Sequence, residues 1–353
     1  MPMLDAPETL CGLVQRYSPS GQESTAVTWL VTRMQALGFT NAYVDETGNA
    51  VGVMGDGPQQ IILLGHIDTV SGEIDVRVEG DVLYGRGTVD AKGPLSSFVD
   101  AVARVGAVEG WQMVVIGVID EERDSVGARG VVERYRPEML VIGEPSGWNR
   151  ITLGYKGSAV ARLQVAQPVS HTAGKDDSAG DVMFAVWQDV LAWVKTWNDD
   201  HPRLFDQILP SIQAMQSSSD GFLAQVVWRV GARLPVDYPP DRWYTQLAHF
   251  ATAHNAVMKP IGFAIPAYRA EKNTSLVRQF LRAIRAKSAK PSFLVKTGTA
   301  DLNIVAPVWN CPAVVYGPGD SSLDHTPNEH IHLSEYAKAV DILEMVLRNL
   351  TNT

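Results

Sequence analysis

The sequence predicts an α/β protein: a mostly parallel, mixed sheet with helices on both faces, interrupted by a smaller inserted α+β domain. Short uninterrupted apolar runs alternate with helix-like stretches over the first third of the chain. Such runs are typical of strands buried on both faces of a sheet, as parallel strands are. In the middle of the chain polar and apolar residues alternate instead, and the first pattern returns near the end.

The first part of the chain predicts strands alternating with helices. Residues 6–38 place apolar residues at helical spacing before Gly38, a common helix stop. The strands and helices that follow are read from uninterrupted and periodic apolar patterns, respectively. We expect strands at 42–45, 50–54, 61–64, 113–119 and 139–142, and helices at 93–108 and 128–135.

The middle part predicts a compact strand-helix-strand-helix unit, after which the first pattern resumes. Its elements are a strand at 155–165, a long tryptophan-containing helix, a strand at 222–233 and a helix at 241–254. Further strands at 293–296 and 313–316 and a helix at 333–350 close the chain. We therefore predict one domain made of residues 1–154 and 269–353, and a second domain inserted at 155–268.

The composition excludes several classes of protein. The chain has 353 residues, 45% hydrophobic and 20% charged, and no apolar run long enough to span a membrane. Its first residues lack the basic and apolar segments of a secretory signal, so we expect a cytoplasmic protein with no membrane partner. The net charge of −9 argues against binding nucleic acid, which normally requires a basic surface.

Polar residues end the buried strand in IILLGHIDTV. Open parallel sheets place their sites at the carboxyl ends of the strands. His66 and Asp68 are two positions apart, so both point to the same side of an extended chain. A neutral imidazole can bind zinc, and a nearby carboxylate can orient it. A buried structural His–Asp pair is the alternative interpretation.

A glycine-rich loop holds Asp90 just before a predicted helix. Gly85, Gly87 and Gly93 allow a tightly folded loop that can hold one carboxylate in a fixed position. This makes Asp90 a candidate bridging ligand for metal. The alternative is that Asp90 caps the helix, the commoner role of an aspartate at such a position.

Three adjacent carboxylates, Asp120, Glu121 and Glu122, follow another apolar strand. Crowded anions repel one another unless cations neutralise them. Consecutive glutamates suit two tasks, because one can bind a metal while its neighbour takes a proton from an attacking water. A solvated acidic turn is the alternative. Glu144 and His325 also follow predicted strands, and neither would be notable alone.

Five motifs hold these residues in order: GHIDT at 65–69, GRGTVDAKG at 85–93, IDEERDS at 119–125, IGEPS at 142–146 and DHTPNEH at 324–330. Together with an inserted domain they resemble the di-zinc exopeptidases and deacylases, a family that includes acetylornithine deacetylase, succinyl-diaminopimelate desuccinylase, aminoacylase and glutamate carboxypeptidase. The resemblance covers essentially the whole chain. It implies a metal-dependent amide hydrolase with two Zn²⁺ per subunit, for which Co²⁺ or Mn²⁺ would also suit the ligands.

The resemblance also implies a role for each motif residue. The implied metal ligands are one bridge and two pairs: Asp90, then His66 with Glu144, and Glu122 with His325. Glu121 would be the general base, and Asp68 would orient His66. The peptide bond between Asp90 and Ala91 would be cis.

In this family the inserted domain acts as a lid and dimerises the enzyme, so a homodimer is implied. SHTAG at 170–174 resembles the lid motif whose histidine reaches the partner's active site, which gives His171 a role at the oxyanion. A surface-loop histidine is the alternative for His171, and bracing of the lid is the alternative for Arg233. The residues considered for binding the substrate's carboxylate are Arg233, Arg269, Asn273, Lys296, Gly298 and Thr299.

Two further strings indicate the substrate. GEPSGWNRITLGYKG at 143–157 and KTGTADLN at 296–303 most resemble hydrolases that release lysine or ornithine from an acidic amino-group carrier protein in lysine or arginine biosynthesis. A desuccinylase would have GTSDGR in place of GTADLN. A deacetylase acting on N-acetyl-lysine or N-acetylornithine, and a non-catalytic zinc-binding homologue, are the alternatives.

The placement of charge fits an acidic partner. Residues 269–296 contain eight basic residues and one acidic residue, a net charge of +7, which leaves −16 for the rest of the chain. A basic surface on an acidic enzyme would steer an acidic carrier towards it. A solvated basic helix is the alternative.

Overall fold

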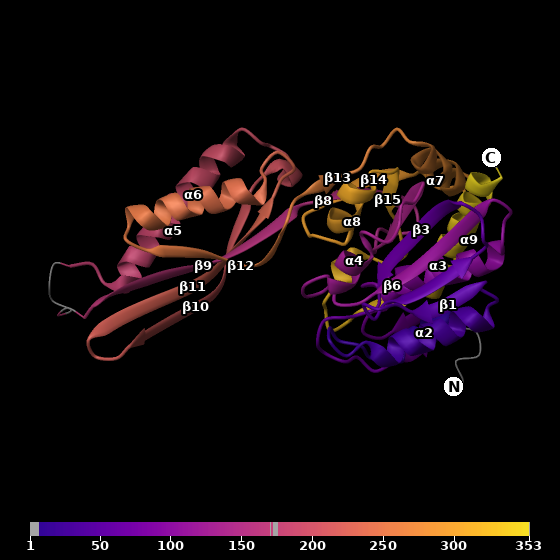
Figure 1. Ribbon diagram of the computed structural model, residues 1–353, viewed down its shortest axis with the longest axis horizontal. Coiled ribbons are helices and arrows are strands. Elements are labelled where there is room, and N and C mark those ends of the chain that lie inside the picture. Colours follow the sequence, from indigo (N-terminus) through magenta and orange to yellow (C-terminus); the bar gives the residue numbers. More distant parts are fainter. Residues whose placement is uncertain (1–6, 170, 172–175, 353) are drawn as a thin grey trace. The chain divides into compact units, whose positions relative to one another are not determined.

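The computed structural model describes residues 7–169, 171 and 176–352. The chain forms two compact units (Figure 1). The first consists of Met1–Gly154, Ala270–Val295 and Ala300–Thr353, and the second of Tyr155–Arg269 and Lys296–Thr299. Each unit has its own hydrophobic core.

A mixed sheet forms the centre of the first unit. Its strands lie in the order β1-β2-β6-β3-β7-β15-β8, and β14 also pairs with β8. Strands β6, β3, β7 and β15 are parallel to one another, whereas β1, β2 and β8 run antiparallel to their neighbours. The bounds are β1 (Asn41–Val44), β2 (Ala50–Met54), β3 (Gln59–His66), β6 (Trp111–Val118), β7 (Met139–Gly143), β8 (Arg150–Tyr155), β14 (Ser292–Lys296) and β15 (Ala313–Val315).

Helices cover both faces of this sheet. Ile61 and Leu63 of β3 belong to the main core, while Ile62 and Leu64 point to the opposite face and are also fully buried. Helix α3 packs against α9, and α4 contacts α8 (Figure 1). The helices of this unit are α1 (Glu8–Val14), α2 (Ser24–Ala36), α3 (Lys92–Val105), α4 (Val126–Val131), α7 (Ser275–Ala286), α8 (Leu302–Trp309) and α9 (Leu333–Thr351). The predicted fold class is confirmed.

A small three-stranded sheet lies beside the loops of this unit. It has the order β16-β5-β4, in which β4 (Arg77–Glu79), β5 (Val82–Tyr84) and β16 (His330–His332) pair antiparallel. The pairing of β16 with β5 brings the segment after His325 next to the loop that leads to Asp90. A short helix, η2 (Ser321–Leu323), precedes His325.

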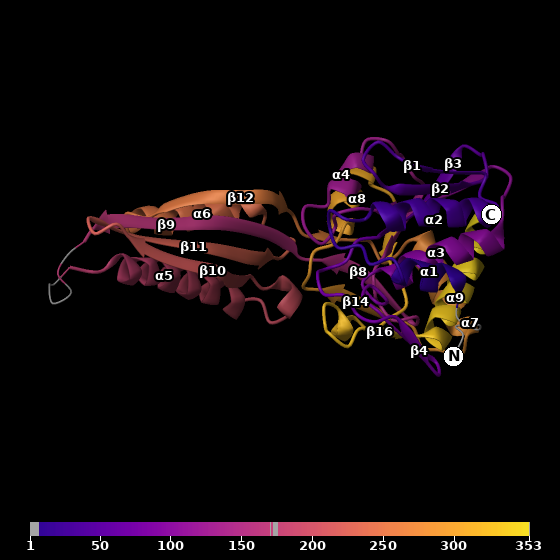
Figure 2. The ribbon, with the colours of Figure 1, turned by 90° about the horizontal axis from the view of Figure 1, so that it is seen from below.

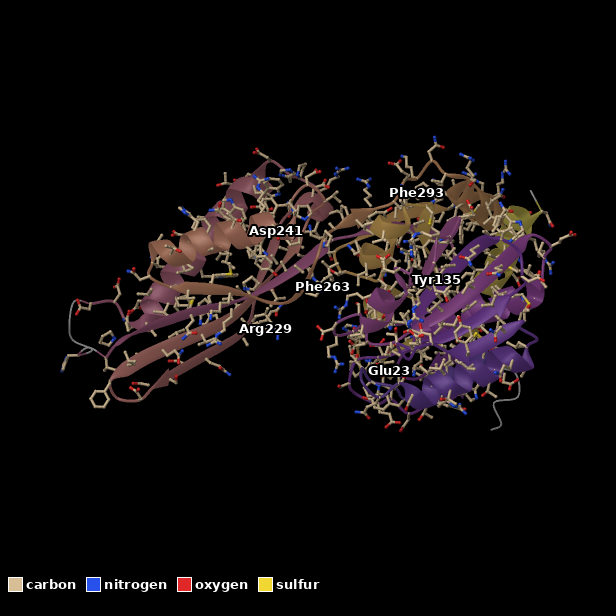
Figure 3. The ribbon with its side chains drawn as sticks, in the orientation of Figure 1. Glu23, Tyr135, Arg229, Asp241, Phe263 and Phe293 are labelled. Atoms are coloured by element: carbon tan, nitrogen blue, oxygen red, sulfur yellow. The ribbon has the colours of Figure 1, made fainter. Side chains whose placement is uncertain are left out.

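The second unit is a four-stranded antiparallel sheet with two helices on one face (Figure 2). Its strands have the order β10-β11-β9-β12, and α5 and α6 pack against β9. Figure 3 labels Arg229 on the uncovered face of this sheet and Asp241 on α6. The elements are β9 (Gly157–Pro168), α5 (Ala179–Asp199), η1 (Leu204–Asp206), β10 (Leu209–Ser219), β11 (Leu223–Leu234), α6 (Pro240–Ala253), β12 (Val257–Ile265) and β13 (Tyr268–Arg269).

The structure differs from the sequence-based elements in several places. The helix expected at 128–135 is α4, which ends at Val131, and the elements β4, β5, β8, β13, β16, α7 and α8 were not predicted. The stretch at 6–38 is two helices, α1 and α2, because the chain turns around Pro19 and Gly21 between them. The inserted unit has two further strands that the sequence did not indicate, β10 and β12. Both are edge strands whose residues are exposed or half-buried, so neither shows the apolar pattern of a core strand.

None of the helices among the described residues combines the length and apolar character needed to cross a membrane.

Candidate metal centre

All four parallel strands of the first unit carry candidate ligands beyond their carboxyl ends. His66 is the last residue of β3, and Glu144 follows β7 directly. Glu121 and Glu122 follow β6 after a turn, and His325 lies in the loop after β15. Because these strands run parallel, their carboxyl ends meet at one edge of the sheet. The fold therefore gathers residues that lie more than 250 positions apart in the sequence.

Asp90 lies between the two histidines. Its Oδ1 is 3.1 Å from Nε2 of His66, and its Oδ2 is 3.0 Å from Nε2 of His325. Asp90 does not cap α3, since the N-cap position is Ala91, so the capping alternative is wrong. The cis peptide predicted between Asp90 and Ala91 is present. One carboxylate thus presents one oxygen to each histidine.

The remaining carboxylates complete two groups around Asp90. Oε1 of Glu144 is 3.9 Å from Nε2 of His66, and Oε1 of Glu122 is 3.0 Å from Nε2 of His325. Ligand atoms of His66, Asp90 and Glu122 all lie within 4.8 Å of one another, close enough to hold a metal ion.

The tautomer of His66 suits a ligand. Its Nδ1 lies 3.0 Å from the carbonyl oxygen of Asp68, and a carbonyl can only accept, so Nδ1 carries a hydrogen. In a neutral ring Nε2 would then direct its lone pair at Asp90 and Glu144. The lone pair of Nε2 and the carboxylate oxygens repel one another unless a cation lies between them. The donor set therefore fits a divalent cation.

The charges of the site lead to the same conclusion. Hydrogen bonds to Asp90 and Glu122 raise the pKa of His325 to about 10. Burial lowers the pKa of His66, but hydrogen bonds to Asp68 and Asp90 outweigh burial and raise it well above its usual range. Both imidazoles are thus driven towards the protonated form by surrounding carboxylates. The carboxylates thus favour positive charge at this place, and bound metal ions would supply it.

Asp68 binds the end of β6 rather than only the histidine. Its Oδ1 accepts a hydrogen bond from the backbone N–H of Glu121 at 3.1 Å, and its Oδ2 accepts from that of Glu122 at 3.1 Å and from Ser20 Oγ at 2.7 Å. Its Oδ1 is 3.5 Å from Nδ1 of His66. Asp68 therefore fixes the backbone that carries both glutamates.

Glu121 has the environment of a proton-transfer group. Burial raises its pKa well above the usual range of a glutamate. The charge of His66 lowers the pKa of Glu121, whereas the charges of Glu144 and Asp301 raise that pKa. A carboxylate with a raised pKa can accept and release a proton near neutral pH.

The candidates for the substrate's carboxylate lie mostly in the second unit. Within it, Arg233 donates a hydrogen bond to Thr299 Oγ1, which donates in turn to the carbonyl oxygen of Lys156 at 3.0 Å. Lys296 lies over the ring of Tyr155, 5.7 Å from its centre, and Gly298 is half-buried.

Two further candidates and His171, the predicted lid histidine, are exposed. Arg269 is exposed in β13, and Asn273 is exposed in the first unit, where it accepts a hydrogen bond from Arg278. His171 is exposed, and the rest of its motif, residues 170 and 172–174, lies outside the described residues. His171 thus belongs to the second unit.

Three residues of the site escaped the sequence reasoning. Asp301 is buried, and burial raises its pKa to about 7, with His66 lowering and Asp68 raising it. Ser20 binds Asp68, and Glu329 binds the loop of Asp90. Asp301 and Glu329 lie in GTADLN and DHTPNEH, strings that were already notable, but nothing in those strings signals their burial.

Comparison with known proteins places this arrangement in a family. The family model "Peptidase family M20/M25/M40" matches residues 62–349. A tripeptidase from Staphylococcus aureus superposes with a TM-score of 0.79 at 17% identity and covers 98% of each chain. Aminopeptidase PepT from Bacillus cereus gives a TM-score of 0.77 at 19% identity, over 97% of this chain and 96% of that one. The chain belongs to peptidase family M20/M25/M40 and is a metal-dependent hydrolase.

Two relatives with higher sequence identity than these structures have names that specify a substrate. A LysW-lysine hydrolase from Deinococcus radiodurans is 42% identical over 341 residues, which cover 94% of this chain and 93% of the relative. A LysW-lysine/LysW-ornithine hydrolase from Saccharolobus islandicus is 27% identical over 351 residues, 98% of this chain and 96% of the relative.

Proposed function

We propose that this chain hydrolyses the amide bond between an amino-group carrier protein, LysW, and lysine or ornithine. One observation carries the proposal: the 42% identity to a LysW-lysine hydrolase extends over nearly the whole chain. It is supported by the convergence of candidate metal ligands and a candidate base at the carboxyl ends of the parallel strands.

Two divalent cations fit the donor set. Zn²⁺ suits imidazole and carboxylate donors, and Co²⁺ or Mn²⁺ would also be accepted. When bound, the two ions would polarise the scissile carbonyl and make an attacking water more acidic. The residues that would hold them are Asp90 with His66 and Glu144, and Asp90 with Glu122 and His325.

Glu121 would move the proton. It would accept a proton as the oxygen of water attacks the carbonyl carbon, and return it to the leaving nitrogen as the C–N bond breaks. The products are a carboxylate on the carrier and the free amine of lysine or ornithine. Asp68 would keep Glu121 in place through its bond to the backbone N–H.

A basic surface on the first unit would receive the carrier. Arg278, Arg282 and Arg285 are exposed and, at spacings of four and three, share one face of α7. The opposite face of α7, which includes Phe280, is buried in the core. Lys287 is less available to a partner, because it pairs with Asp341 at 2.6 Å.

The second unit would form the lid and the contact between subunits of a homodimer. Strand β10 lies at an edge of its sheet, and every residue from Ser211 to Ser219 is exposed. A long exposed edge strand offers unpaired backbone groups to another chain. Exposed apolar side chains, Met215 and Phe222, lie on β10 and on its turn to β11.

The test compares lysyl-LysW, ornithyl-LysW and N-acetyl-lysine as substrates. We expect kcat/KM to be about 100-fold or more higher for a carrier substrate, because binding energy from the carrier would be used in the transition state. Higher kcat/KM for acetyl-lysine would instead identify a deacetylase. As a control, Glu121→Gln should lower kcat by about 10²- to 10⁴-fold while metal remains bound.

A further inference from the structure

Glu329 is a fully buried carboxylate that no step of the proposed reaction uses. Its Oε1 accepts hydrogen bonds from the backbone N–H groups of Val89, at 2.9 Å, and Asp90, at 3.0 Å. Its Oε2 accepts from the backbone N–H of Gly87 at 3.0 Å and from Nη1 of Arg86 at 2.9 Å. All four donors belong to the loop that ends at Asp90.

The same carboxylate ties two ligand-bearing segments together. Glu329 lies four residues after His325, in the segment that leads into β16. Arg86 reaches back to that segment and donates to the carbonyl oxygen of Thr326 at 3.1 Å, while its Nε donates to the carbonyl of Gly72 at 2.8 Å. The pairing of Glu329 with Arg86 therefore fixes the Asp90 loop against the His325 segment.

A carboxylate is the side chain that these donors require. An ionised glutamate only accepts hydrogen bonds, so both oxygens can face N–H groups. A glutamine at this position would turn its amide NH₂ towards two of those donors. An isosteric change would thus leave buried donors unpaired and loosen the loop.

We propose that Glu329 is a positioning residue of the metal centre, which sets the distance between Asp90 and His325. The inference rests on the proposed function, because it presumes that these residues bind metal. Second-layer groups of this kind keep ligands in the geometry that a metal needs, and their loss usually weakens affinity. A purely structural role would cost stability but leave metal affinity unchanged.

The test measures Co²⁺ affinity and the visible absorption spectrum of bound Co²⁺, together with thermal unfolding of the metal-free protein. Glu329→Gln is compared with Asp45→Asn, a matched control. Asp45 also accepts backbone N–H bonds, from Thr47, Gly48 and Asn49, but in the turn between β1 and β2. The partners of Asp45, which also include Asn49 Nδ2 and Arg134, are not candidate metal ligands.

We expect Glu329→Gln to weaken Co²⁺ binding about 10- to 100-fold and to change the Co²⁺ spectrum. Asp45→Asn should lower the unfolding temperature and bind Co²⁺ as the wild type does. The inference is overturned if Glu329→Gln keeps wild-type affinity and spectrum. If Glu329→Gln does not fold, Glu329→Asp, which keeps the charge, is held to the same criteria. A wild-type protein that binds no Co²⁺ would instead refute the proposed function.

Discussion

The carboxylate of Asp68 accepts a hydrogen bond from the backbone N–H of Glu121 at 3.1 Å. It accepts a second from the N–H of Glu122, so one side chain anchors the backbone of two adjacent glutamates. The imidazole of His66 is nearer to the carbonyl oxygen of Asp68, at 3.0 Å, than to its carboxylate, at 3.5 Å. Asp68 therefore joins the ends of β3 and β6.

Replacing Asp68 should mainly impair the chemical step. In Asp68→Ala the N–H groups of both glutamates lose their acceptor, so we expect kcat to fall about 10- to 100-fold with a smaller change in KM. Ser20→Ala is the matched control, because it removes only the hydroxyl bond to Asp68. Steady-state kinetics and metal content check both variants. Equal losses in the two variants would contradict this role for Asp68.

The basic face of α7 should bind the carrier but not a small substrate. Arg282→Glu should raise KM for lysyl-LysW severalfold at low salt and leave KM for acetyl-lysine unchanged, because the reversed charge repels an acidic partner. In the wild type, high salt should likewise raise KM for lysyl-LysW and leave KM for acetyl-lysine unchanged. Arg136→Glu is the control: this exposed arginine precedes β7, at the end of the strand opposite the metal centre. A similar effect from Arg136→Glu would remove the docking assignment.

His171 should act on the active site of the partner subunit. His171→Ala should lower kcat about 10²- to 10³-fold if the imidazole binds the oxyanion. Co-expression of His171→Ala with Glu121→Gln shows which subunit's site His171 serves. In the mixed dimer, the His171→Ala subunit keeps its own Glu121 and would receive His171 from the Glu121→Gln subunit. We expect the mixed dimer to recover activity. No recovery, in a dimer verified by light scattering, would place His171 within its own subunit's site.

Lys156 should make stability depend on pH. Its buried Nζ donates to the carbonyl oxygens of Leu204, Phe205 and Gln207, and burial lowers its pKa from 10.5 to about 8, although Asp206 raises it. Between these two pKa values the unfolded chain holds a proton that the folded chain has released. Stability therefore rises with pH in this window, and below about pH 8 the cost of the buried charge is fully present.

Urea unfolding, followed by tryptophan fluorescence, measures this contribution. From about pH 7.5 to about pH 9.5 we expect Lys156 to add about 2 kcal/mol to the free energy of unfolding. Lys156→Met removes the titrating group and serves as the reference, so the difference between the two proteins isolates Lys156 from other groups that titrate. A difference that does not change with pH would show that the pKa of Lys156 is not lowered.

Sequence reasoning worked best where the residue type carries the chemistry. The pairing of apolar runs with polar ends predicted β3, β6 and β7 and singled out the candidate ligands beyond them, because buried parallel strands leave little room for polar residues elsewhere. It failed for β10, whose exposed residues show no apolar alternation. It also failed for Glu329 and Asp301, because nothing local distinguishes a buried carboxylate from an exposed one.

The sequence by itself determined which donors this protein has: two imidazoles and a set of carboxylates at strand ends, with a basic segment at 269–296 in an otherwise acidic chain. Only the tertiary structure decided how they pair. Asp90 faces His66 with one oxygen and His325 with the other, and Asp68 supports Glu121 rather than serving His66 alone. The reason is physical: residue type fixes what an atom can bind, whereas distance and orientation across more than 200 residues depend on how the strands are packed.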